Sequence, residues 1–212
     1  MKLSNIFVIL VIVAFAAIIS CEGTNDPAFK GNLIPLEVGK VWVYDHAEYT
    51  NNGASGFETE SEAKIFAKTE NNTYLISNLF SHSEIGQLGI HYYNDDEGFY
   101  SAGPIGNLEN LLFKYPAKRG DIYYNSEQTS MDIVISTDTL IVVAGKEYKC
   151  YGYESKAVDN PDSYAVTYVK PGLGIVQYSR YSISETDTIL TMQRKLKEVK
   201  KSMAIAKLNN CP

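Results

Sequence analysis

The chain has 212 residues, of which 45% are hydrophobic and 21% are charged, and these values predict one folded domain and exclude a disordered polymer. Its formal charge is -6 at pH 7, and because lysine and arginine gather near the end, the rest of the chain is distinctly acidic. Nucleic-acid binding needs clustered lysine and arginine against phosphates, so we expect no nucleic-acid partner.

The first twenty residues have the pattern of an export signal. Lys2 gives a positive start, Ile6 to Ile19 form an uninterrupted apolar run, and Ser20 precedes Cys21. Because a membrane-spanning helix needs roughly 17–25 apolar residues, we interpret residues 1–20 as a cleaved signal peptide. The last residues, Ile18-Ile19-Ser20-Cys21, resemble the lipobox of bacterial lipoproteins. The resemblance implies cleavage before Cys21 and attachment of acyl chains, such as palmitate, to that residue.

Residues 21–34 are predicted to form a lipidated cysteine and a flexible tether, because they hold Gly, Asn, Asp and Pro without periodicity. The protein is therefore expected to be exported and anchored to the cell envelope through Cys21. Glu22 follows the cysteine where aspartate would, by resemblance to proteobacterial sorting, retain a lipoprotein at the inner membrane. This favours the outer membrane and leaves the periplasmic or surface face open.

Two further cysteines, Cys150 and Cys211, would lie in an oxidising compartment, where thiols can pair. A bridge closing about 60 residues would contribute up to ~4 kcal/mol in the chain-entropy model. Cys211 lies next to the terminus, however, where chains often fray. A Cys150–Cys211 disulfide and an idle, buried Cys150 are both open interpretations.

From Pro35 onward, short β-rich segments alternate with turn residues, and no helical stretch of core length separates them. Strands joined by tight turns pair antiparallel, because parallel pairing requires long crossovers. We therefore predict an all-β domain over residues 35–198. Its fold would be a single antiparallel meander of about ten to twelve strands curled into a half-barrel or barrel, with a β-sandwich as the alternative. The predicted strands are Val41–Thr50, Phe57–Lys68, Tyr74–Phe80, Leu88–Tyr93, Phe99–Ala102, Leu111–Tyr115, Ile122–Asn125, Met131–Ser136, Thr139–Val143, Tyr148–Lys156, Tyr164–Lys170, Ile175–Ser184 and Thr188–Leu196.

The segment Phe57–Lys68 alternates almost perfectly between apolar and charged residues, which is typical of a strand with one wet face. Its carboxylate row, Glu58, Glu60 and Glu62, is better explained as that solvated face than as a cation site. Residues 199–212 are expected to form a basic C-terminal tail. A short amphipathic helix is an alternative there, because Leu196, Val199, Met203 and Ala206 recur at spacings of three and four.

One sequence pattern occurs twice, at 35–42 and 116–123: Pro, three residues, Gly, one residue, a β-branched residue and an aromatic ring. Proline fixes φ and glycine permits a positive φ, so the pattern suits a sharp corner leading into a strand. A corner used twice is favoured over an internal duplication. We therefore expect Gly39 and Gly120 to occupy equivalent turns.

The segment 35–44, Pro-Leu-Glu-Val-Gly-Lys-Val-Trp-Val-Tyr, resembles the "PLxxGxxWxY" start of uncharacterised Bacteroidota-type envelope lipoproteins. The hairpin segments 143–151 and 171–176, the second of which reads Pro-Gly-Leu-Gly-Ile-Val, fit the same pattern, although Val143 stands where those proteins usually have proline. The resemblance covers most of the mature chain, but its motifs are short. It implies a shared β fold and no established activity.

No catalytic, metal or cofactor motif is present: the sequence has no His-Glu-x-x-His, no Gly-x-Ser-x-Gly and no glycine-rich phosphate loop. His82 and His91 near the acidic turn 95–97 could be drawn together as a metal site, but their spacing is not diagnostic. The tyrosines on three successive predicted strands could form one aromatic patch that binds a ligand, with cross-strand packing as the alternative. They are Tyr151, Tyr153, Tyr164, Tyr168, Tyr178 and Tyr181.

We therefore expect no enzyme, no cofactor and no metal. The favoured function is a membrane-anchored, non-catalytic binding module whose concave, tyrosine-rich face takes an amphipathic or glycan ligand. The alternative is a structural or partner-binding subunit of an envelope complex. The partner would accordingly be the membrane through Cys21, together with an unidentified small molecule, lipid, glycan or envelope protein.

Overall fold

The computed structural model describes residues 31–50, 54–80, 90–103, 109–185 and 187–202, which belong to a compact unit starting at Gly31. In this part of the chain every regular element is a strand, and no helix there could cross a membrane. The strands are β1 (Lys40–Tyr49), β2 (Ser55–Lys68), β3 (Tyr74–Ser77), β4 (His91–Asn94), β5 (Gly98–Ala102), β6 (Glu109–Lys114), β7 (Ile122–Tyr124), β8 (Ser130–Val143), β9 (Lys146–Ala157), β10 (Ser163–Lys170), β11 (Gly174–Ile183) and β12 (Thr188–Lys201).

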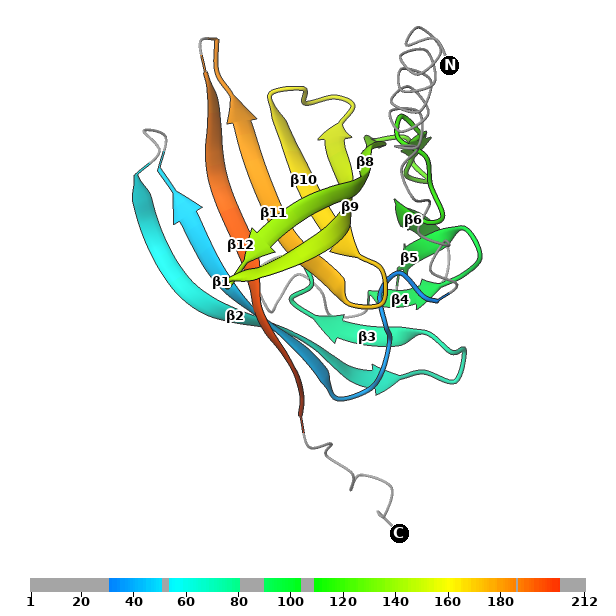
Figure 1. Cartoon of the computed structure of the whole chain (residues 1–212). Coiled ribbons are helices and arrows are strands. Elements are labelled where there is room, and N and C mark those ends of the chain that lie inside the picture. The colour runs from blue at the N-terminus through cyan, green and yellow to red at the C-terminus, as the bar shows by residue number, and fades with distance from the viewer. Residues whose placement is uncertain (1–30, 51–53, 81–89, 104–108, 186, 203–212) are drawn as a thin grey trace, which may run out of the picture. The chain divides into compact units, whose positions relative to one another are not determined.

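The twelve strands form one antiparallel sheet in the order β6-β5-β4-β3-β2-β1-β12-β11-β10-β9-β8-β7. Consecutive strands are neighbours everywhere except at β6 and β7, and the first strand pairs with the last. The sheet curls strongly into a nearly closed barrel (Figure 1). The predicted all-β antiparallel meander curled into a barrel is therefore confirmed.

Side chains, rather than a ladder, close the seam between β6 and β7. The Tyr123 hydroxyl donates to the Leu112 carbonyl at 3.0 Å, and the Tyr153 hydroxyl donates to the Lys114 carbonyl at 2.9 Å. Both carbonyls belong to edge strand β6, where alternate carbonyls point away from β5 and need a partner. Two tyrosine hydroxyls thus bind carbonyls of the β6 edge that could otherwise pair with another strand.

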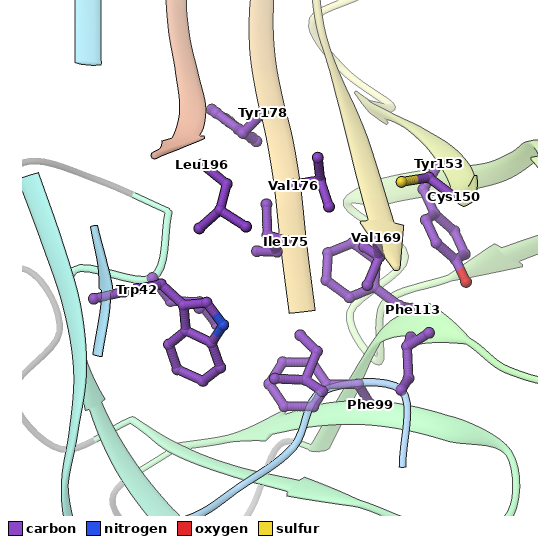
Figure 2. Close-up of a cluster of buried hydrophobic side chains, with 14 of the residues drawn as sticks. Trp42, Phe99, Phe113, Cys150, Tyr153, Val169, Ile175, Val176, Tyr178 and Leu196 are labelled. Atoms are coloured by element: carbon purple, nitrogen blue, oxygen red, sulfur yellow. The ribbon is translucent and has the colours of Figure 1, made fainter. Parts of the chain in front are cut away.

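Aromatic contacts across the barrel identify the inner face of the sheet. Phe113 on β6 packs against Tyr153 on β9 with ring centroids 4.9 Å apart, although these strands are not ladder neighbours. Phe80 similarly lies 6.2 Å from Tyr178 on β11. Figure 2 shows Phe99 and Phe113 with Tyr153 in the same cluster, and all three are almost fully buried. We call the opposite side of the sheet the outer face.

The two sequence motifs at residues 35–44 and 171–176 meet inside the barrel. Trp42 Nε1 donates to the Leu173 carbonyl at 2.7 Å, and the Tyr44 hydroxyl donates to the Ile175 carbonyl at 3.1 Å. Gly174 lies between these acceptors, and a Cβ there would come within 3.0 Å of Trp42 Nε1. The position of the Trp42 indole therefore requires glycine in the β10–β11 turn. This one contact explains both the tryptophan of the first motif and the glycine of the second.

The repeated corner is the same turn at both positions. Gly39 and Gly120 each have φ of 89°, and the residue after each glycine donates its N–H to the carbonyl three residues earlier at 3.0 Å. A positive φ at the third position with this bond is the signature of a type II turn. Each glycine N–H also reaches a nearby strand, at Ile65 on β2 and at Val134 on β8. The predicted equivalence of the two corners is confirmed.

Strand β8 joins two segments that we predicted as separate strands, 131–136 and 139–143. The polar residues Ser136, Thr137 and Asp138 do not end the strand, because two register shifts against β9 absorb them as irregularities. Beyond these shifts, residues 139–150 of β8 and β9 form an arm that lies near β11 and β12 without pairing with either (Figure 1).

Both ends of the predicted domain differ from the prediction. Leu33 and Ile34, which we expected in the flexible tether, are buried in the core. Strand β12 continues through Lys201, so residues 199–201 extend the sheet instead of starting a tail, and residues 196–201 are not helical. The lysines of this segment, Lys197, Lys200 and Lys201, lie on a strand that pairs with β1. Met203 and Ala206, which the helix alternative also used, lie outside the described residues, as does the remainder of the predicted tail.

Candidate functional site

The six candidate tyrosines do not form one patch, which corrects the expectation from the sequence. Strand alternation and register place Tyr151, Tyr153 and Tyr178 on the inner face and Tyr164, Tyr168 and Tyr181 on the outer face. The division follows from spacing, because residues two apart share a face, whereas Tyr178 and Tyr181 are three apart.

The inner tyrosines are part of the packed interior. Tyr153 is 1% exposed, and burial raises its pKa well above the usual range. Its ring contacts Phe113, and the ring of Tyr151 meets that of Tyr115 edge to face at 5.2 Å. These rings pack in the described interior, and the Tyr153 hydroxyl donates to a backbone carbonyl, so cross-strand packing accounts for them.

A buried arginine completes this interior. Arg194 on β12 is 1% exposed, its Nη1 donates to the carbonyls of Asn78 and Leu79 at 2.9 Å, and its Nη2 donates to Ser61 Oγ at 3.0 Å. Its guanidinium also lies 4.5 Å from the Tyr44 ring centroid. Burial lowers the pKa of Arg194. The arginine thus holds the residues that follow β3, Asn78 and Leu79, inside the barrel.

The outer tyrosines form a half-exposed cluster. Tyr164 and Tyr181 are directly paired across β10 and β11, with rings nearly parallel at 15° and centroids 4.8 Å apart. Lys156 Nζ lies 5.5 Å from the Tyr164 ring centroid, and Lys156 also pairs with Glu154 at 2.7 Å. This stacked pair presents aromatic surface to solvent on the outer face.

A groove of about 470 Å³ lies on the outer face, where β1, β2 and β12 run side by side. We call it the outer groove. Its wall combines carboxylates, an amide, an ammonium and a phenol around a small alanine. The lining residues are Asp45, His46, Ala47, Tyr49, Glu58, Thr59, Glu60, Gln193 and Lys195.

Ion pairs border the outer groove and explain the carboxylate row of β2. Lys197 binds Glu60 and lies 3.9 Å from Asp45, and Lys200 binds Glu62 at 2.7 Å. The hydrogen bond from Lys197 holds the pKa of Glu60 below its usual range. Glu60 and Glu62 are therefore paired with lysines of β12 on a solvated face, and no group of ligands suited to a metal occurs among the described residues.

The histidines and acidic turn have structural partners. His46 is 2% exposed and its Nε2 lies 3.3 Å from Glu48 Oε1, while His91 Nδ1 lies 2.9 Å from Thr73 Oγ1. Asp95 accepts the N–H groups of the turn it begins, at Glu97 and Gly98. His82 lies outside the described residues.

Of the three cysteines, only Cys150 lies in the described part. It is a fully buried thiol whose pKa burial raises to about 12, so it is an unreactive group inside the packed core. Cys21 and Cys211 lie outside the described residues, and so does the predicted signal peptide. Lipidation of Cys21 and a Cys150–Cys211 disulfide therefore stay predictions.

No family model matches the sequence, and no curated protein matches it either. Among solved structures, the chain is similar to a candidate lipoprotein from Parabacteroides distasonis, with 11% identity, a TM-score of 0.34 and coverage of 80% of this chain and 99% of the other. It is also similar to a candidate exported protein with a YmcC-like fold from Bacteroides fragilis, with 12% identity, a TM-score of 0.33 and coverage of 81% and 100%. Neither similarity is close enough to transfer a function.

Sequence reasoning missed the outer groove. Its residues come from 45–49, 58–60 and 193–195, and they meet only because β12 returns to pair with β1. The one sequence signal was the polar face of β2, which carries Glu58 and Glu60. Nothing in the sequence indicated that Gln193 and Tyr49 would share its surroundings.

Proposed function

We propose that the protein is an exported envelope lipoprotein, anchored through Cys21, whose barrel is a non-catalytic binding module for a glycan. The address is supported by the leader sequence, with its short apolar run and its lipobox-like end. The outer membrane is the proposed site of anchoring, because Glu22 follows the cysteine.

The observation that carries the ligand proposal is the outer groove. Its volume of about 470 Å³ is within the range of roughly 300–1,000 Å³ usual for ligand sites. Carboxylates accept hydrogen bonds, the Lys195 ammonium donates them, and the Gln193 amide does both. A ligand rich in hydroxyl groups can satisfy such a mixed surface, and the Tyr49 ring adds an apolar contact.

The alternative ligand, an amphipathic molecule held in the concave face, has less support. An acyl chain needs an apolar cavity, whereas the described inner face is filled by rings such as Phe99, Phe113 and Tyr153, all less than 5% exposed. The proposed site therefore moves from the concave face to the outer groove. Only the glycan part of our expectation about the ligand is retained.

Calorimetric titration of the lipidated protein in detergent tests this proposal. Neutral oligosaccharides such as cellohexaose, mannohexaose and chitohexaose are compared with dispersed phospholipid and with lipopolysaccharide. An oligosaccharide at 100 times its dissociation constant should stabilise the fold by about 2.7 kcal/mol. Tyr49→Ala should abolish this stabilisation by the oligosaccharide. Tyr124→Ala, at a 53% exposed tyrosine on β7, is the matched control. Stabilisation by phospholipid alone would contradict the proposal.

A partner-binding role is the second candidate, and the arm at residues 139–150 favours it. Leu140 and Val142 point away from the packed side of the arm and are 64% and 62% exposed. Exposed apolar side chains on a projecting hairpin suit a protein contact. Leu140→Ser with Val142→Ser should then release a co-purifying envelope protein, with oligosaccharide binding unchanged. Unchanged co-purification would remove this candidate.

A further inference from the structure

A buried serine holds two glutamine side chains on the outer face next to the groove. Ser179 on β11 is 0% exposed, and its Oγ accepts the Gln177 Nε2 at 3.3 Å and the Gln193 Nε2 at 3.2 Å. A hydroxyl oxygen has two lone pairs, so it can accept both bonds at once. We call Gln177 and Gln193 the carboxamide pair.

These bonds fix the direction of both amide groups. With each nitrogen turned toward Ser179, each Oε1 stays available as an acceptor, and each nitrogen retains one further N–H. Gln177 and Gln193 are half-exposed, so these groups can meet a ligand. The barrel thus presents two oriented amides from neighbouring strands, which need no reorganisation when a ligand arrives.

The ladder register joins the carboxamide pair to the outer groove. Ala47, Gln193 and Ser179 form one row across β1, β12 and β11, and Ala47 and Gln193 also line the groove. Two steps between strands of about 4.8 Å place Ser179 roughly 10 Å from Ala47. The groove and the carboxamide pair are therefore parts of one surface.

The stacked tyrosines continue this surface. Tyr181 follows Ser179 by two residues on β11, so it shares the outer face at a distance of about 7 Å along the strand. Its ring is stacked on that of Tyr164. An aromatic face beside oriented hydrogen-bonding groups is an arrangement that binds sugars, because a sugar ring has an apolar face and polar edges.

We propose that the carboxamide pair is a subsite that reads adjacent hydroxyl groups of a neutral sugar, with the ring of that sugar on Tyr181. This rests on the proposed function and deepens it, since it makes the ligand a linear oligosaccharide that extends from the outer groove to the tyrosine pair. Ser179 is a positioning residue, which acts only by orienting Gln177 and Gln193.

Charge defines the ligand further. Three carboxylates, Asp45, Glu58 and Glu60, line the groove, whereas two lysines balance them: Lys195 in the lining, and Lys197, which pairs with Glu60 and lies near Asp45. An acidic sugar would meet this excess of carboxylates, whereas an uncharged sugar would not. The subsite therefore selects neutral oligosaccharides over acidic ones.

The test is a mutant cycle on the lipidated protein, titrated with the neutral hexasaccharides above and with hexagalacturonate as the acidic probe. Replacing both amides, Gln177→Leu with Gln193→Leu, should weaken binding of the neutral oligosaccharide by about tenfold or more. Ser179→Ala should weaken it by a few fold in the wild type and by nothing further in the double-leucine variant, because its role runs through the amides. Ser182→Ala, at an exposed serine of β11, is the control.

Two results would overturn the inference: an equal effect of Ser179→Ala in both backgrounds, or binding of hexagalacturonate as tight as that of the neutral oligosaccharides. If Tyr49→Ala abolishes binding while the glutamine changes leave it intact, the outer groove binds glycan and the carboxamide subsite is wrong. If no oligosaccharide binds the wild type, the proposed function fails together with the subsite.

Discussion

The two glycine corners allow a matched prediction about stability. Gly39 and Gly120 share a φ of 89°, but their surroundings differ: a Cβ at Gly39 would lie 3.1 Å from the Ser202 carbonyl oxygen, whereas a Cβ at Gly120 would meet nothing within 4 Å. Alanine at Gly120 therefore carries only the backbone strain of a positive φ, on the order of 1–2 kcal/mol. Alanine at Gly39 carries that strain and a close contact with backbone.

Thermal unfolding of the single variants measures this difference. A domain of this size loses roughly 2–4 °C of Tm per kcal/mol, so Gly120→Ala should lower Tm by about 2–8 °C. Gly39→Ala should lower it further. Gly120→Asn should be milder than Gly120→Ala, because asparagine tolerates positive φ better than other side chains with a Cβ.

The reasoning would be refuted if Gly120→Ala were as destabilising as Gly39→Ala, since the close contact with the Ser202 carbonyl would then add nothing to the shared cost of the positive φ. An unchanged Tm in both variants would show that the turns relax without strain. Gly39→Val and Gly120→Val should keep the same order at larger effect, because a β-branched side chain suits a positive φ least.

Three further outcomes are expected. Burial raises the pKa of Asp132 to about 6 from 3.8, so its charged form opposes folding above pH 6. Acidification from pH 7 to 4 should therefore raise the free energy of unfolding by up to about 3 kcal/mol. Asp132→Asn should flatten that part of the pH profile in chemical denaturation. Tyr153→Phe should cost about 1–3 kcal/mol by leaving the Lys114 carbonyl unpaired, whereas Tyr124→Phe at an exposed site should leave the urea midpoint unchanged. Labelled fatty acid should enter the wild type and not Cys21→Ser, and equal labelling would remove the lipoprotein proposal.

The strands were predictable because the signal is local. Alternation in β2 and turn residues between segments depend on neighbours in sequence, and both appear in the structure at nearly the predicted bounds. The predictions failed where pairing with a strand distant in sequence determines the local structure. Ser136, Thr137 and Asp138 looked like a break, yet β9 pairs across them. Leu196 and Val199 suited a helix by spacing, yet β1 pairs with their segment as a strand.

The candidate site was predictable only in its residue types. The sequence placed six tyrosines on three strands, and the odd separation of Tyr178 and Tyr181 within β11 already puts these two on opposite faces. The outer groove depends on β12 returning to β1, which the sequence does not state. The orientation of the Gln193 side chain depends in turn on Ser179, which lies on the neighbouring strand β11.

The pairing of β1 with β12 also has a consequence for synthesis. The Ser202 N–H donates to the Gly39 carbonyl at 2.7 Å, so β1 begins next to the place where β12 ends. Opened between β6 and β7 and joined near Ser202 and Gly39, a circularly permuted chain would follow the sheet from one edge to the other with every ladder intact. In the native order, β1 can pair with β2 early, but its other edge has no partner strand until β12 is made. A nascent chain is therefore open to wrong pairing along β1 for almost the whole of its synthesis.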